Sequence, residues 1–143
     1  MVKVDTTQWP VVYMAVDGLA TVPEMQEYIR AMETLLSHSQ HASERFGLVF
    51  LSDMSDDEYN SFKREKAAQK LSNEWLKANK ALIGEQCIAI AMVTKAGAMM
   101  KLMKPVAKFT LKRTMGAPGD IFFTREEAAA WMAKQRASAK SAG

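Results

Sequence analysis

The sequence has one cysteine and two histidines in 143 residues, which leaves little room for disulfide, thiol or metal chemistry. A single cysteine, Cys87, cannot form a disulfide within the chain. It lies inside an apolar run with no base near it in sequence, so we interpret it as a small core residue and not a nucleophile. His38 and His41 have no third ligand beside them and are assigned a structural or surface role. We therefore expect no metal and no cofactor.

The sequence also lacks long apolar segments and a nucleotide-binding signature. The apolar run at residues 87–93 is too short to cross a membrane. The first residues include Lys3 and Asp5 and form no apolar signal segment, so we expect a cytoplasmic protein. Gly116 and Gly119 are not followed by the Lys-Ser or Lys-Thr pair of a phosphate loop.

What the chain does have is the composition of an ordinary globular domain. Hydrophobic residues make up 48% and charged residues 24%, and a chain of this length can bury a sizeable core without disulfides or metals. We expect one domain at residues 1–136 and a flexible tail at 137–143. The net charge of +3 permits an anionic partner without requiring one.

Residues 87–93 carry no polar side chain and predict a strand that is buried on both faces. Three capping boxes, in which a hydroxyl residue precedes a glutamate by three positions, predict helix starts at Thr21, Ser55 and Thr124. Apolar spacing predicts one long second helix over 56–83 and a third over 96–114. Further strands are expected at 2–5, 11–16, 46–53 and 121–123. The predicted fold is α/β: one mixed, mainly parallel sheet of four or five strands flanked by helices, in the order β-β-α-β-α-β-α-β-α.

Three residues around the second predicted helix are candidates for a binding site. Asp53 and Ser55 follow a parallel strand at its carboxyl end, where open α/β sheets place their ligands. Arg64 falls in line with the apolar face of the predicted long helix and needs a partner, for which Asp53 is the candidate. The alternatives are that Ser55 is only a cap, that Asp53 is only an ion partner, and that Arg64 extends to solvent.

The third predicted helix carries a stripe of lysines that includes Lys101, Lys104 and Lys108, and no acidic residue occurs between Glu85 and Asp120. The commonest role of such a stripe is solubility. The alternative is an anionic surface, more plausibly lipid headgroups or an acidic protein than nucleic acid, because specific nucleic-acid readers rely on arginine and exposed aromatics. Methionines on the same helix could also line an adaptable groove.

The order of elements resembles that of the STAS or SpoIIAA-like domains, and in detail the bacterial STAS/SEC14-like branch. The resemblance covers nearly the whole chain and mostly concerns core and cap positions: Trp9, Pro10, Asp17, Gly18, Asp53, Arg64, Trp75, Cys87, Glu127 and Trp131, with residues 48–50, 89–93 and 122–123. Resemblance to anti-sigma-factor antagonists implies a serine switched by phosphorylation after a strand, and Ser55 holds that place here. Resemblance to the SEC14 side implies a lipid or another apolar small ligand.

These observations favour a non-enzymatic regulatory or protein-interaction module with an unidentified protein partner. The alternative is a small-ligand or lipid-binding domain that uses the Met- and Lys-rich third helix, and an enzyme ranks third. A homodimer is a further option, and no specific nucleic acid is expected. A docking module should expose an apolar patch, whereas a ligand domain should contain a pocket beneath the third helix.

Overall fold

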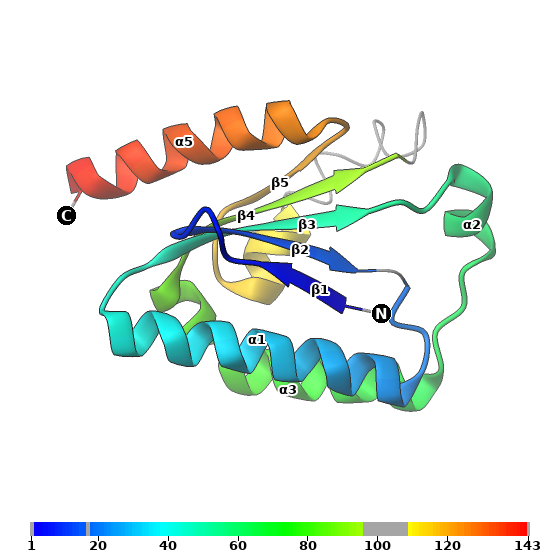
Figure 1. The fold of residues 1–143 in the computed structure, drawn as a ribbon. Coiled ribbons are helices and arrows are strands. Elements are labelled where there is room, and N and C mark those ends of the chain that lie inside the picture. The colour runs from blue at the N-terminus through cyan, green and yellow to red at the C-terminus, as the bar shows by residue number, and fades with distance from the viewer. Residues whose placement is uncertain (1, 17, 96–108, 143) are drawn as a thin grey trace.

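The computed structural model describes residues 2–16, 18–95 and 109–142 and contains one five-stranded mixed sheet (Figure 1). The strands are β1 (Val2–Asp5), β2 (Val11–Val16), β3 (Phe46–Ser52), β4 (Cys87–Thr94) and β5 (Gly119–Phe122). They lie in the order β1-β2-β3-β4-β5; β1 runs antiparallel to β2, and the other neighbours are parallel. The predicted α/β fold with a mixed, mainly parallel sheet is confirmed.

The helices form unequal layers on the two faces of the sheet (Figure 1). Helices α1 (Val22–Ala42) and α3 (Lys66–Gln86) cover one face, and α5 (Arg125–Ala142) lies across the other. The short helix α2 (Asp56–Ser61) lies beyond the carboxyl end of β3. None of the helices in the described ranges combines the length and the apolar character that a membrane crossing requires.

Strand β4 is largely buried on both faces, as its apolar sequence predicts. Cys87, Ala89, Ile90 and Ala91 have no exposed surface. Ile90 packs into the core beneath α1 and α3, whereas Ala89 and Ala91 pack beneath α5. The small side chains on the α5 side of β4 let this single helix lie close to the sheet.

All three predicted capping boxes are present. In each, the hydroxyl oxygen accepts from the backbone N–H three residues later and donates to the carboxylate of that same residue. The pairs are Thr21 with Glu24, Ser55 with Glu58 and Thr124 with Glu127, with N–O distances of 3.3, 3.2 and 3.2 Å.

The predicted long helix over 56–83 is wrong, because residues 62–65 separate α2 from α3. The break has a tertiary cause. The backbone N–H of Glu65 donates to the carbonyl oxygen of Ala20 at 2.8 Å, a bond that joins this segment to the turn after β2. A continuous helix would have used that N–H internally.

Two other segments end differently from the prediction. Helix α5 continues to Ala142 and so takes in most of segment 137–143. Of the predicted third helix, residues 96–108 lie outside the described residues, and 109–115 are helical.

Residues 109–117 are held against α3 by a glycine-to-glycine contact. A Cβ atom on Gly84 would lie 2.9 Å from the carbonyl oxygen of Gly116. Gly116 itself has a φ of +79°, and a Cβ atom there would lie 2.8 Å from the carbonyl oxygen of Lys80. Neither position has room for a side chain.

We expect Gly84→Ala to destabilise the protein even though alanine is the better helix former. The clash with the Gly116 carbonyl should cost about 1–3 kcal/mol, against a gain in helix propensity of up to about 1 kcal/mol. The free energy of unfolding in urea measures the difference. Lys77→Ala, at an exposed position of α3, is the control and should change stability by less than about 0.5 kcal/mol. A more stable Gly84→Ala protein would contradict the close packing.

Candidate functional site

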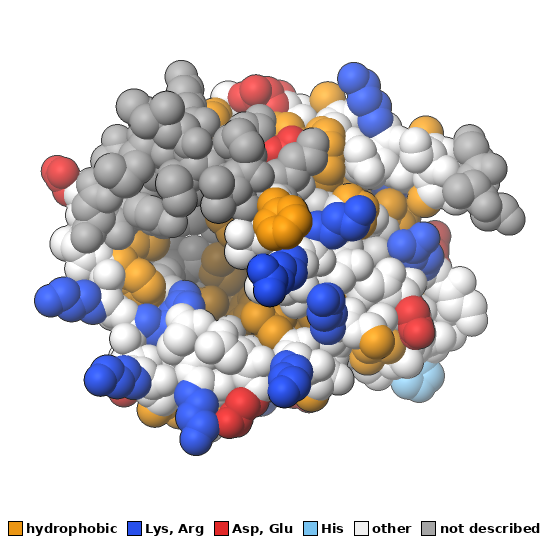
Figure 2. Space-filling view, turned by 180° about the vertical axis from the view of Figure 1, so that it is seen from behind, with side chains coloured by type: hydrophobic (Ala, Val, Ile, Leu, Met, Phe, Trp, Pro, Cys, Tyr) orange, Lys and Arg blue, Asp and Glu red, His pale blue; other side chains and the backbone are white. Residues whose placement is uncertain are grey.

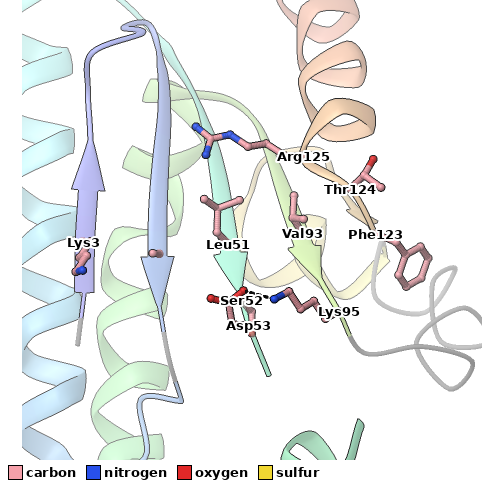
Figure 3. A pocket seen from close by; sticks show the side chains of 10 residues that line it. Lys3, Leu51, Ser52, Asp53, Val93, Lys95, Phe123, Thr124 and Arg125 are labelled. Carbon is pink, nitrogen blue, oxygen red and sulfur yellow. Dashed lines mark ion pairs between the residues drawn. The ribbon is translucent and has the colours of Figure 1, made fainter. Parts of the chain in front are cut away.

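The carboxyl ends of the parallel strands border a pocket of about 420 Å³, at the edge where the sequence predicts a site (Figure 3). Strand ends, the residues that follow them and the first turn of α5 form its walls. The lining residues are Lys3, Ala15, Leu51, Ser52, Asp53, Val93, Lys95, Phe123, Thr124 and Arg125.

The charges around this pocket are mostly positive, and the single acid among its lining residues is paired. Asp53 forms an ion pair with Lys95 at 3.2 Å, with 83% and 71% of the two side chains exposed (Figure 3). The guanidinium of Arg125 lies 4.1 Å from the centre of the Tyr13 ring. Because the ion pair is exposed to water, it contributes little to stability.

The predicted ion pair between Asp53 and Arg64 is wrong. Arg64 Nε donates to the carbonyl oxygen of Leu19 at 2.9 Å, and Nη1 donates to the side-chain oxygen of Gln69 at 2.8 Å. A longer contact of 3.4 Å joins Nη2 to the carbonyl oxygen of Gly18. The prediction failed because it placed Arg64 on a helix, whereas Arg64 lies in the segment between α2 and α3.

Ser55 lies close to this edge but acts as the cap of α2. Its exposed hydroxyl donates to Glu58 Oε1 at 3.2 Å. The structure therefore shows the capping role that the sequence allowed, and a phosphorylation role stays a prediction.

The remaining predicted site residues, Lys101, Lys104 and Lys108, lie outside the described residues. Lys112, which continues their stripe, is exposed.

A second cavity, of about 240 Å³, lies on the other face of the sheet and was not located from the sequence. It lies among α1, α3, the strand ends and residues 109–115. Figure 2 shows this side of the molecule hollowed, with hydrophobic side chains inside the hollow and lysine and arginine side chains around it. The lining residues are Val16, Gly18, Leu19, Met25, Tyr28, Phe50, Ser52, Met54, Arg64, Ser72, Met92, Leu111 and Met115.

Two polar side chains of this cavity, Tyr28 and Arg64, have unused hydrogen-bonding or charge capacity. Tyr28 is 8% exposed, and its hydroxyl forms no hydrogen bond with any residue that the structure describes. Burial raises the pKa of Tyr28 above its ordinary value; the nearby Cys87 adds to the rise and the Arg64 charge opposes it. The phenol is therefore a proton donor at neutral pH.

The rarest residue types occupy structural positions. Burial raises the pKa of the Cys87 thiol to about 12, although Arg45 opposes the rise. The ring of His38 contacts Trp9 edge-on, with ring centres 4.6 Å apart. His41 Nδ1 lies 2.8 Å from the carbonyl oxygen of Ser37. Among the described residues no three histidine, cysteine or acidic side chains gather as a metal site would require.

Comparison with protein-family models, curated proteins and solved structures finds no match to this chain. The candidate sites therefore rest on their own geometry, and the resemblance to STAS-like domains stays a prediction.

We expect the effects of Asp53→Asn and Arg64→Gln on stability to be additive, because the two side chains have different partners. Arg64→Gln should lower the free energy of unfolding by about 1–2 kcal/mol through loss of its bond to Leu19. Asp53→Asn should change it by less than about 0.5 kcal/mol. A double-mutant cycle in urea measures the coupling, expected within about 0.3 kcal/mol of zero. A coupling well above 1 kcal/mol would restore the predicted ion pair.

We expect the Cys87 thiol to be inert while the protein is folded. The thiol keeps its proton up to a pKa of about 12, whereas in the unfolded chain it loses the proton near its ordinary value of 9.0. The resulting contribution to stability is complete below pH 9 and is lost as the pH rises toward 12. A disulfide reagent that releases a coloured thiolate at pH 8 should titrate one thiol in guanidinium and almost none in native buffer. Rapid reaction of the folded protein would contradict this burial.

Proposed function

We propose that this chain is a non-enzymatic module that binds a small, mainly apolar molecule in the cavity between α1, α3 and residues 109–115. The observation that carries the proposal is the mainly apolar cavity whose wall includes two polar side chains, those of Tyr28 and Arg64. Binding sites for small molecules are typically apolar concavities with a few polar groups that orient the ligand. This cavity has that character.

The size of the cavity indicates a small ligand. A volume of about 240 Å³ accommodates roughly eight non-hydrogen atoms, at about 30 Å³ for each. That is less than a phospholipid requires. The ligand is therefore closer in size to a short-chain or single-ring molecule than to an intact membrane lipid.

The flexible side chains of the wall support a ligand site. Met25, Met92 and Met115 come from α1, β4 and residues 109–115, and methionine side chains adapt to molecules of different shape. All three residues lie outside the predicted helix over 96–114, so the proposed site extends beyond the methionine groove suggested by the sequence.

A regulatory protein-docking function is the second candidate. Lys3, Lys95 and Arg125 come from three separate segments and surround the pocket at the carboxyl ends of the strands, an arrangement that suits an acidic partner. Against it, the only large hydrophobic side chains exposed among the described residues are Val4 and Phe109, which are 41% and 66% exposed. We rank docking second because a protein interface usually has a hydrophobic centre. A cytoplasmic location and a homodimer stay predictions.

No catalytic step belongs to the proposal. The Cys87 thiol, which was weighed as a nucleophile, is buried with a raised pKa, and the Ser55 hydroxyl, the candidate phosphorylation site, caps α2. Neither lines the cavity.

We expect 1-hexanol to bind in the cavity and to shift the methyl NMR signals of Met25, Met92 and Met115. Met132, a residue of α5 that is buried against the opposite face of the sheet, is the internal control and should not shift. Ser72→Leu should abolish the shifts, because Ser72 lines the cavity from α3 and leucine would fill it.

Ala78→Leu adds a similar bulk at an exposed position of α3 and should leave the titration unchanged. Equal shifts at Met132 and at the cavity methionines would indicate nonspecific binding. An unresponsive wild-type protein would contradict the ligand function and place the docking function first.

A further inference from the structure

We propose that the ligand of this cavity carries a carboxylate, bound between the Arg64 guanidinium and the Tyr28 hydroxyl, on an apolar body that fills the space behind them. The inference rests on the proposed ligand-binding function and specifies the chemical class of the ligand. Its elements are a cation without an ion pair among the described residues, a tyrosine in the same cavity wall, and the absence of acids among the described lining residues.

Arg64 supplies a permanent positive charge that the described part of the chain does not neutralise. Its hydrogen bonds go to two backbone carbonyl oxygens and to the amide of Gln69, all of which are uncharged. No carboxylate in the described ranges forms an ion pair with it. Arginine binds carboxylates through two parallel N–H groups, and Nη2 is the less committed group here because its contact with Gly18 is 3.4 Å long.

Tyr28 supplies a second donor from α1. Its phenol stays protonated at neutral pH, so it can donate but carries no charge that would repel an anion. Tyr28 and Arg64 both line the cavity, one from α1 and the other from the segment between α2 and α3. A carboxylate between them would accept a hydrogen bond from the Tyr28 hydroxyl and neutralise the Arg64 charge.

The remaining wall favours an anion with an apolar tail. Among the described residues that line the cavity, none is an aspartate or glutamate. Phe50, Leu111 and Met115 provide apolar surface for the body of the ligand. Burial of such a tail provides the hydrophobic part of the binding free energy.

The test compares hexanoate with 1-hexanol, which have the same carbon chain and differ in the head group. In the methionine-methyl NMR titration, hexanoate should bind at least roughly tenfold more tightly than 1-hexanol, as expected for a charge-assisted hydrogen bond in place of a neutral one. A parallel titration with benzoate, which is close to hexanoate in size, distinguishes an aliphatic from an aromatic body, since both present a carboxylate.

Variants then test which residues bind the carboxylate head group. Arg64→Gln should remove the preference for hexanoate and leave the affinity for 1-hexanol within about twofold. Tyr28→Phe keeps the ring and should weaken hexanoate severalfold, which tests the site even where Arg64→Gln fails to fold. Lys77→Gln removes an exposed charge elsewhere on α3 and should change neither affinity.

The outcomes separate the two proposals. Equal binding of hexanoate and 1-hexanol by the wild-type protein would overturn the carboxylate inference and leave the ligand function in place. Failure of both molecules to shift the cavity methionines would overturn the ligand function itself. Loss of the preference for hexanoate in Lys77→Gln would show that general surface charge, and not Arg64, is responsible.

Discussion

The burial of β4 on both faces is the constraint on which the rest of the structure depends. A strand without a polar side chain over seven residues needs a cover on each side, and the two covers differ because the side chains on the two faces of β4 differ. Ala89 and Ala91 let one helix, α5, lie close to the sheet. On the other face Ile90 and the partly buried Met92 meet the larger α1 and α3 layer. Both candidate sites lie where these covers end.

The cavity results from the way in which residues 62–65 and 109–117 pack beside the layer formed by α1 and α3. Helix α3 begins only after the chain has turned back at residues 62–65 to bond the turn after β2. Arg64 is therefore directed toward Leu19 and the cavity, not along a helix. Gly84 and Gly116 hold residues 109–117 against α3 on the remaining side. The space between these contacts is bounded by backbone hydrogen bonds and close packing as well as by side chains.

Much of the fold could be predicted because it depends on residues that are close together in the sequence. The apolar run of β4 and the hydroxyl–glutamate spacing of the three helix caps depend on residues within one element, and the structure has them all. The helix break could not be predicted in the same way. Residues 56–83 have helical spacing, and what interrupts them is a bond from Glu65 to Ala20, 45 positions away in the chain. Periodicity carries no information about such a partner.

The same distinction between local and tertiary information applies to the two candidate sites. The pocket beside Asp53 could be placed at the carboxyl ends of the strands, since the order of strands and helices fixes that edge. The ion partner of Asp53 could not be predicted from the sequence, because the choice between Arg64 and Lys95 depends on how two loops fold. The cavity was harder still: it is defined by space that side chains leave unfilled, and its lining comes from residues as far apart as Val16 and Met115.

The two candidate sites are not independent, because they share the end of β3. Ser52 lines both the pocket beside Asp53 and the cavity beside Arg64, and Met54 continues the cavity wall toward α2. The side chain of Ser52 lies at the last position of β3, where the sheet no longer separates its two faces. A molecule in the cavity and a partner at the strand ends would therefore both contact Ser52. For this reason the ligand-binding and docking functions are better tested together, on one set of variants, than treated as exclusive.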